Sequence, residues 1–143
     1  MVMTGSMHTE EFVEEQVLDL GLMKISRDLK LAAATLTPEE VRYMVDYYYQ
    51  LQEDRKGSAN QVRAGAESGE PHLLLGWLAT NHRRFESQIK AALDIYSDGQ
   101  PLGRWMKSIV GIGPVIAAGL MCHIDIEKAP TVGHIWRFAG LDP

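Results

Sequence analysis

The 143-residue sequence predicts an all-α protein: a long antiparallel helical hairpin, coiled-coil-like, followed by a small unit of two short helices. Three observations predict this architecture. Apolar residues recur at helical spacing in two long segments, 38–66 and 71–96. A short run of small and polar residues separates these segments, as a loop between two helices requires. A glycine-rich turn at 111–114 then joins two further apolar segments of helical length.

Length and composition set the broad class. The chain is long enough for one domain, or for two small helical units that share a core. Its 45% hydrophobic and 23% charged residues are typical of a globular protein. Because no apolar run approaches the length of a membrane span and no signal peptide is recognisable, we expect a soluble, cytoplasmic protein without a membrane partner. The single Cys122 excludes an internal disulfide and a cysteine-rich zinc site.

Charge is distributed unevenly along the chain. The net charge is −5, with 7 Lys/Arg against 13 Asp/Glu in residues 1–71 and 7 against 6 in residues 72–143. Between Gly99 and Pro114 two residues are basic, Arg104 and Lys107, and none is acidic. Any nucleic-acid contact is therefore expected in the C-terminal half. The acidic N-terminal half is expected to face solvent or a protein partner.

The first third of the chain predicts a leader and one helix. Residues 1–8 show no periodicity, and we expect a frayed leader there. Thr9 is a suitable cap for a helix from Glu10 to Ala34, whose first turn is acidic. The domain organisation expected is 1–36 as leader and helix, 37–98 as the long helix pair, and 99–143 as the turn-containing unit.

The second helix has the clearest start signal in the sequence. Thr37 is its cap, Pro38 its first residue, and Glu40 completes a capping box. The helix is expected either to end near Lys56 or to continue poorly to about Ala66. Three consecutive tyrosines at 47–49 suggest base stacking, but successive helical residues point about 100° apart, so packing is the preferred interpretation.

The third helix restarts at Pro71 and carries an apolar stripe. Its positions are Leu74, Trp77, Leu78, Asn81, Phe85, Ile89, Ala92 and Tyr96. This spacing predicts that the segment packs antiparallel against 38–66. Asn81 interrupts the stripe, as a buried polar residue does when it fixes register. Because a long hairpin commonly has a second exposed face, we expect a homo-oligomer formed through residues 38–96.

The segment after the break at 97–101 has the pattern of a helix-hairpin-helix. Pro114 suits the first position of a helix that is expected to run to about Met121. The amides of Gly113, Val115 and Ile116 would then point outward at a helix start, which favours anions. The simpler alternative is a compact turn in an all-helical protein. A final helix is expected from Thr131 or Gly133 through Phe138, ended by Gly140 in the left-handed conformation.

This hairpin is the candidate nucleic-acid site. Its predicted contact residues are Arg104, Lys107, Gly111, Ile112, Gly113, Val115 and Ile116. The expected partner is DNA or structured RNA, held at its phosphates by amides and nearby cations with little base readout. With so few cations, binding is expected to be weak and salt-dependent. The second helix begins with apolar residues, which counts against strong independent binding.

No other chemistry carries a specific signal. The five histidines form no pair with carboxylates at a metal-ligand spacing. Cys122 and His123 are adjacent and diverge on a helix, so a buried cysteine is preferred over a nucleophile. No Walker loop is present, and Gly111–Gly113 lacks the third glycine of a dinucleotide fingerprint. We therefore predict no catalytic residue, no metal site and no cofactor, and expect that the protein is not an enzyme.

Two motifs in the last third of the chain resemble a known family. Residues 108–120, SIVGIGPVIAAGL, followed by residues 135–143, IWRFAGLDP, are similar to the C-terminal domain of the Piv/MooV-type insertion-sequence transposases. That domain has a GIGP-type hairpin and a later GL-x-P motif. The long helix pair before it is similar in placement to the coiled coil of those recombinases.

The departures from that family shape the functional prediction. The RuvC-like nuclease domain that precedes the coiled coil has no counterpart in residues 1–36, and the nucleophilic serine of the family lies beyond GL-x-P. The resemblance therefore implies a noncatalytic, transposase-derived nucleic-acid-binding accessory protein of a mobile element or phage. One alternative is a protein-interaction module whose acidic helices dock on a host or mobile-element enzyme, for example as an inhibitor. Another is a fragment of a longer serine-dependent transposase or recombinase.

Overall fold

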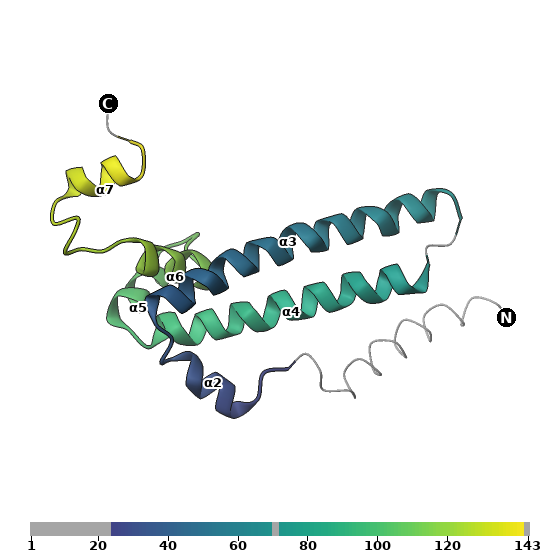
Figure 1. Ribbon diagram of the computed structural model, residues 1–143, viewed down its shortest axis with the longest axis horizontal. Helices are drawn as coiled ribbons and strands as arrows, with labels where there is room; N and C mark the ends of the chain where they lie inside the picture. The colour runs from purple at the N-terminus through teal and green to yellow at the C-terminus, as the bar shows by residue number, and fades with distance from the viewer. Residues whose placement is uncertain (1–23, 70–71, 142–143) are drawn as a thin grey trace. The chain divides into compact units, whose positions relative to one another are not determined.

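The computed structural model describes residues 24–69 and 72–141, and this part of the chain is helical without strands (Figure 1). Its elements are α2 (Arg27–Ala33), α3 (Pro38–Glu67), α4 (Leu73–Asp98), α5 (Pro101–Lys107), α6 (Pro114–His123) and α7 (Val132–Phe138). The prediction of an all-α fold with a long helical hairpin and a following pair of short helices is confirmed.

The long hairpin consists of α3 and α4, which run antiparallel (Figure 1). The predicted capping box begins α3: Thr37 N donates to Glu40 Oε2 at 2.8 Å, and Glu40 N donates to Thr37 Oγ1 at 3.3 Å. Each side chain satisfies an amide that the first helical turn leaves without a partner. Helix α3 continues to Glu67, so the alternative that it ends near Lys56 is wrong.

The start of the described chain differs from prediction. Residues 24–26 are not helical, and α2 begins at Arg27, so one continuous helix from Glu10 to Ala34 is wrong at this point. Ile25 N donates to Gln88 Oε1 at 3.2 Å, a side-chain acceptor instead of a helical carbonyl. The predicted leader, the Thr9 cap and the helix before residue 24 lie outside the described residues.

The part of the chain that the structure describes divides into two compact units. Of the described residues, the first unit contains 24–26, 48–69 and 72–88, and the second contains 27–47 and 89–141. The three-part division at residues 36 and 98 stays a prediction.

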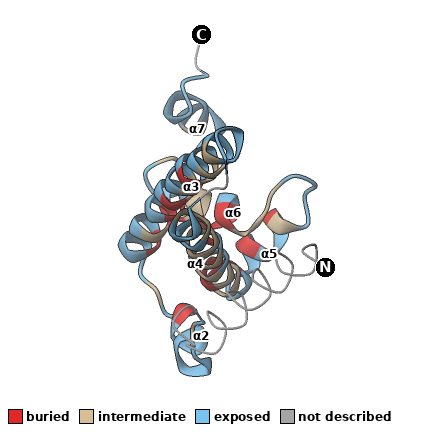
Figure 2. Ribbon diagram, turned by 90° about the vertical axis from the view of Figure 1, so that its right-hand side faces the viewer, coloured by how far each residue is buried: buried red, intermediate tan, exposed pale blue. Residues whose placement is uncertain are grey.

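The second unit has an apolar core. It is built from the start of α3, the end of α4, and α6, with single residues from α2 and α5 (Figure 2). Its buried members are Ala33, Val41, Val45, Ala92, Leu93, Tyr96, Met106, Val115, Ala117, Ala118 and Cys122. Val41 and Leu93 are completely inaccessible. Burial of this apolar surface is the main stabilising term for the unit.

The first unit buries polar groups beside its apolar ones. Tyr48 and Leu51 of α3 are buried. Arg55 Nε donates to Glu86 Oε2 at 2.6 Å, and this hydrogen-bonded pair raises the pKa of Arg55 above its ordinary value. Burial, and next the Glu86 charge, raise the pKa of Tyr48.

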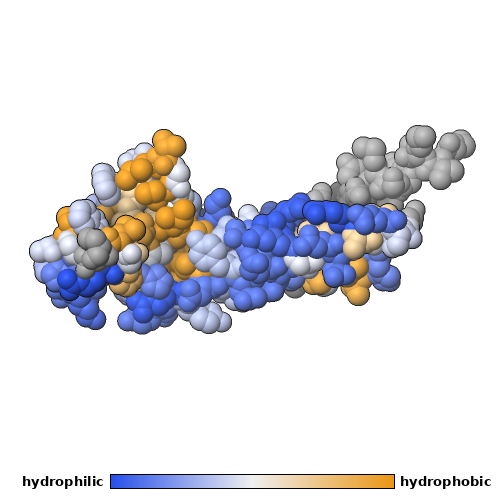
Figure 3. Space-filling model, turned by 90° about the horizontal axis from the view of Figure 1, so that it is seen from above, coloured by the Kyte–Doolittle hydropathy of each residue, from blue (hydrophilic) through white to orange (hydrophobic). Residues whose placement is uncertain are grey.

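The apolar stripe of α4 is only partly buried. Its later positions, such as Ala92 and Tyr96, are in the core, whereas Leu74 is 60% exposed and Trp77 45% exposed. The facing half of α3, residues 57–67, is small and polar and offers large side chains little to pack against. Figure 3 shows a largely hydrophilic surface along α3. Asn81 is only half-buried, so the prediction that it is buried is wrong; its Nδ2 donates to Trp77 O within its own helix at 2.8 Å.

Candidate nucleic-acid interface

Helix α5 packs directly on the backbone at the end of α4. A Cβ added to Gly103 would lie 2.0 Å from Ser97 O, so only glycine permits this approach. Ser97 is completely buried, and its hydroxyl donates to Leu93 O at 2.8 Å. This contact fixes the position of α5, the first helix of the α5–α6 pair, on the end of α4.

A short hydrogen-bonded turn connects α5 to α6. Ser108 Oγ donates to Trp105 O at 2.6 Å, Ile109 N donates to Met106 O at 3.0 Å, and Ile112 N donates to Ile109 O at 3.1 Å. Gly111 has a φ of +92°, which side chains rarely tolerate. The turn therefore requires glycine at 111, as the sequence suggested.

The start of α6 leaves backbone amides available. Gly113 is its N-cap in an extended conformation (φ −92°, ψ −177°), and Pro114 occupies the first position. Ala117 N donates to Gly113 O at 3.0 Å, which closes the first helical turn after Val115 and Ile116. An added Cβ at Gly113 would meet no atom within 4 Å. Neither φ nor packing therefore requires glycine at 113, and a helix N-cap in this extended conformation accepts glycine as well as Ser, Thr, Asp or Asn.

Helix α6 is held against the beginning of α3. Ala117 and Ala118 are completely buried, and an added Cβ at Gly119 would lie 3.6 Å from Val45 Cγ1. Arg42 Nη2 donates to Cys122 O at 2.9 Å and satisfies a carbonyl in the last turn of α6. These contacts hold the middle and the end of α6 against the beginning of α3.

The two predicted cations have different surroundings. Lys107 Nζ donates to Asp94 Oδ1 at 2.6 Å and pairs with Asp98, and its side chain is only 15% exposed. Burial lowers the pKa of Lys107, but hydrogen bonds to both carboxylates outweigh it and leave that pKa raised. Arg104 is exposed and donates from Nη1 to Asp98 O at 2.7 Å. Of the two, Arg104 is the better placed for a phosphate, because Lys107 already has two anionic partners.

The remaining predicted residues surround the turn, and Ile112 and Gly113 are half-buried. Val115 is buried and would contribute only its amide, whereas Ile116 is 45% exposed. Sequence reasoning missed how apolar the exposed surface of this region is (Figure 3). Its members are Leu102, Trp105, Ile109, Val110 and Ile116. Val110 was the signal in the sequence that could have indicated this apolar surface. It lies in the turn before Gly111, outside both helices, where its apolar side chain belongs to no helix face.

The other candidate chemical groups are arranged as follows. Cys122 is buried, and burial raises the pKa of its thiol, whereas the adjacent His123 is exposed. In the described residues, no group of three His, Cys, Asp or Glu side chains is arranged to hold a metal ion. No helix in the described ranges is both long and apolar enough to cross a membrane.

The end of the chain follows prediction. Thr131 is the N-cap of α7, the helix ends at Phe138, and Gly140 has a left-handed φ of +73°. Leu141 N donates to Trp136 O at 2.8 Å, which closes the helix end.

Comparisons with protein-family models, with curated proteins and with solved structures found no match for the chain. The resemblance to insertion-sequence transposases therefore stays a prediction that depends on the two motifs alone.

Proposed function

We propose that this chain is a noncatalytic nucleic-acid-binding protein that contacts phosphates of DNA or structured RNA through residues 111–116. One observation carries the proposal: the amides of Val115 and Ile116 lie in the first turn of α6, directly after Gly113, whose Cβ position has no atom within 4 Å. Amides at a helix start, reinforced by the helix dipole, are a favourable phosphate site.

The surrounding side chains support weak binding. Arg104 of α5 is an exposed cation, while Lys107 is paired with Asp94 and Asp98. One or two phosphate contacts give a small counterion term, so affinity is low and falls with salt. A site of such low affinity is suited to act as one of several nucleic-acid contacts within a larger protein–nucleic-acid assembly.

The motif resemblance supports an origin in the transposase of a mobile element or phage. In this view the chain retains the DNA-contacting end of such a protein and acts in the cytoplasm as an accessory factor. In the alternative version of this proposal, the chain is a fragment of a longer serine-dependent recombinase, and the catalytic residues lie in another part of that protein.

Gly113→Asp tests the proposal sharply. Aspartate is a favourable N-cap, so this change is expected to maintain or raise the melting temperature by stabilising α6. The same carboxylate occupies the space in front of the amides and repels phosphate. We expect binding to a short duplex and to a branched DNA at low salt to weaken at least about tenfold, equal to ~1.4 kcal/mol.

Two matched variants complete this experiment. Gly113→Asn has a similar cap and volume without the charge, and should weaken binding less. Gly57→Asp places the same charge on α3, where an added Cβ also meets no atom within 4 Å, and should leave binding unchanged. Equal binding by wild type and Gly113→Asp would contradict the proposal.

Docking on another protein is a second candidate, favoured by one observation. The acidic residues of α3 are all exposed: Glu39, Glu40, Asp46, Glu53, Asp54 and Glu67. Such a surface suits a basic partner, for example a nucleic-acid enzyme whose substrate it would mimic. Capture of a host protein that survives nuclease treatment, and is lost in a Glu39→Gln/Asp46→Asn variant, would favour this function. Capture unaffected by those changes would argue against it.

Self-association through residues 38–96 belongs to the proposal as well. The exposed apolar side chains at the start of α4 motivate it, because exposed hydrophobic clusters commonly mark contact surfaces. Sedimentation equilibrium should show a dimer or larger species that Leu74→Glu dissociates. A monomer at high concentration would remove this part of the proposal.

A further inference from the structure

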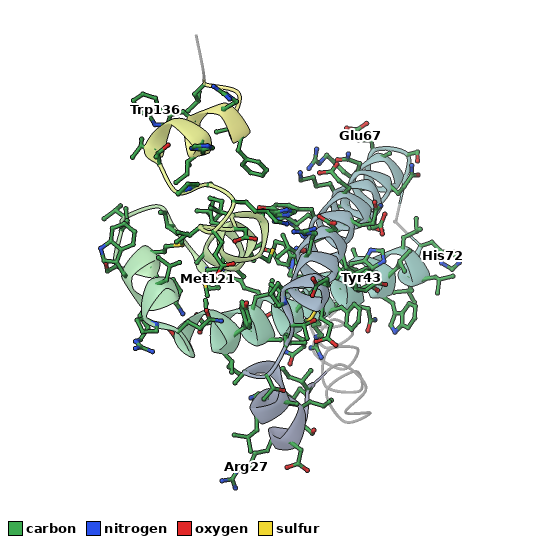
Figure 4. All side chains as sticks on the ribbon, turned by 60° about the vertical axis from the view of Figure 1, so that its left-hand side comes forward. Arg27, Tyr43, Glu67, His72, Met121 and Trp136 are labelled. Carbon is green, nitrogen blue, oxygen red and sulfur yellow. The ribbon has the colours of Figure 1, made fainter. Side chains whose placement is uncertain are left out.

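A cavity of ≈ 350 Å³ lies in the second unit, between the end of α6, the turn that follows, and α7. Figure 4 shows the two bordering helices, with Met121 on α6 and Trp136 on α7. This volume is within the range of small-molecule sites. Part of the lining is apolar, from Ile124, Ala129, Ile135 and Phe138.

The remaining lining residues are ionisable and mostly basic. They are His123, Asp125, Lys128, His134 and Arg137. They comprise one lysine, one arginine, two histidines and one aspartate. The cavity therefore combines apolar walls with side chains that attract an anion.

Local hydrogen bonds order the turn that carries the acidic and basic groups. Asp125 O accepts from Lys128 N at 3.1 Å and from Ala129 N at 2.9 Å, while Asp125 Oδ1 accepts from Glu127 N at 3.0 Å. Lys128 Nζ lies 3.8 Å from Asp125 Oδ2, and its side chain is 86% exposed. Because such a long, solvated ion pair contributes little, the ammonium is available to another anion.

A histidine and an aromatic ring from α7 complete the cavity. His134 Nδ1 lies 2.6 Å from Thr131 Oγ1, which leaves Nε2 as the ring nitrogen for a ligand. Phe138 is 66% exposed, so its ring can stack with a flat aromatic ligand. The cavity thus offers an aromatic surface, apolar walls and anion-binding side chains together.

We propose that this cavity binds a single nucleotide, with its base stacked on Phe138 and its phosphate beside Lys128 and His134. A base has a flat face that stacks on aromatic side chains independently of sequence, and its phosphate supplies the anion. The shared chemistry has two sources, a free nucleotide or an unpaired nucleotide within a strand. In the second case the inference rests on the proposed nucleic-acid function.

Calorimetric titration of the full chain with AMP tests this site. Adenosine and inorganic phosphate, titrated separately, should each bind at least about tenfold more weakly than AMP, because each lacks one half of the interaction. Lys128→Glu and Phe138→Ala alter exposed residues and should each weaken AMP binding about tenfold. The matched charge reversal Lys90→Glu, on an exposed position of α4, should leave it unchanged.

Two results would overturn the proposal: absence of AMP binding to the folded wild type, or equal AMP affinity in wild type, Lys128→Glu and Phe138→Ala. Competition by a single-stranded oligonucleotide for the AMP site would identify a strand-borne nucleotide, and lack of competition a free one. The phosphate site at α6 is tested separately. If that site is wrong, Gly113→Asp binds duplex DNA like the wild type, and this result does not bear on AMP binding in the cavity.

Discussion

The two units use the same pair of long helices in different ways. In the second unit, the beginning of α3 and the end of α4 bury Val41, Val45 and Leu93 against α6, whose alanines allow close approach. In the first unit, α3 and α4 bury Glu86 in an ion pair and leave Leu74 largely exposed. One hairpin is thus held by apolar packing in one unit and by more polar pairing in the other.

This difference indicates where each kind of contact is needed. Small buried residues in the second unit allow α6, which carries the proposed phosphate site at its start, to pack closely on its neighbours. Exposed apolar residues in the first unit make it the candidate region for contacts between copies.

Glycine substitutions should separate the units most strongly. Gly103→Val in the second unit forces a Cβ to within 2.0 Å of Ser97 O, and should cost about 3 kcal/mol or more in the free energy of unfolding. Gly57→Ala in the first unit meets no atom and should stabilise the protein by about 0.5–1 kcal/mol. Denaturant unfolding measures both. Equal effects would contradict the close packing assigned to α5.

Leucine truncations should show a comparable contrast between the two units. Leu93→Ala removes a completely buried side chain and should destabilise by about 2–5 kcal/mol. Leu74→Ala alters a side chain that is 60% exposed and should change the monomer by less than about 0.5 kcal/mol. A large loss at Leu74 under dilute conditions would show that the first unit buries it.

The ion pair of the first unit provides a third test. Glu86→Gln leaves Arg55 without its anionic partner and should cost about 1–3 kcal/mol in thermal or denaturant unfolding. The double variant Arg55→Met/Glu86→Leu replaces the pair with apolar groups and should recover most of that loss. If the double variant is as unstable as Glu86→Gln, the pair itself, and not the removal of a partner, provides the stability.

The smallest expected effect is a pH dependence that arises in the second unit. Burial raises the pKa of Cys122, so the folded chain retains a proton that the unfolded chain releases. The contribution of this thiol to the free energy of unfolding is therefore complete below the unfolded pKa of about 8.5. It is lost as the pH rises from there through the folded pKa. Urea unfolding should be measured from about pH 8 to about pH 10, the range in which the thiol of the unfolded chain loses its proton. Over this range the free energy of unfolding of Cys122→Ala should decrease less steeply with pH than that of the wild type. An unchanged slope would exclude the thiol as its source.

Much of the fold was predictable because its signals are local. The Thr37–Glu40 capping box, Pro114 at a helix start and Gly140 beyond a helix end each act within a few residues. The burial of the α4 stripe was not predictable, because it depends on the facing segment of α3. The same holds for the candidate site. Gly111 was identifiable from the turn pattern, whereas the partners of Lys107, 9 to 13 residues earlier in the chain, emerge only from the folded structure.

The most direct test of the central claim is a titration of the ¹⁵N-labelled chain with a short duplex at low salt, followed by amide chemical shifts. We expect the amides of Gly113, Val115 and Ile116 to shift most, the shifts to diminish as salt is added, and Gly113→Asp to remove them. Shifts confined to the acidic face of α3 or to the start of α4, with those three amides unmoved, would contradict this claim.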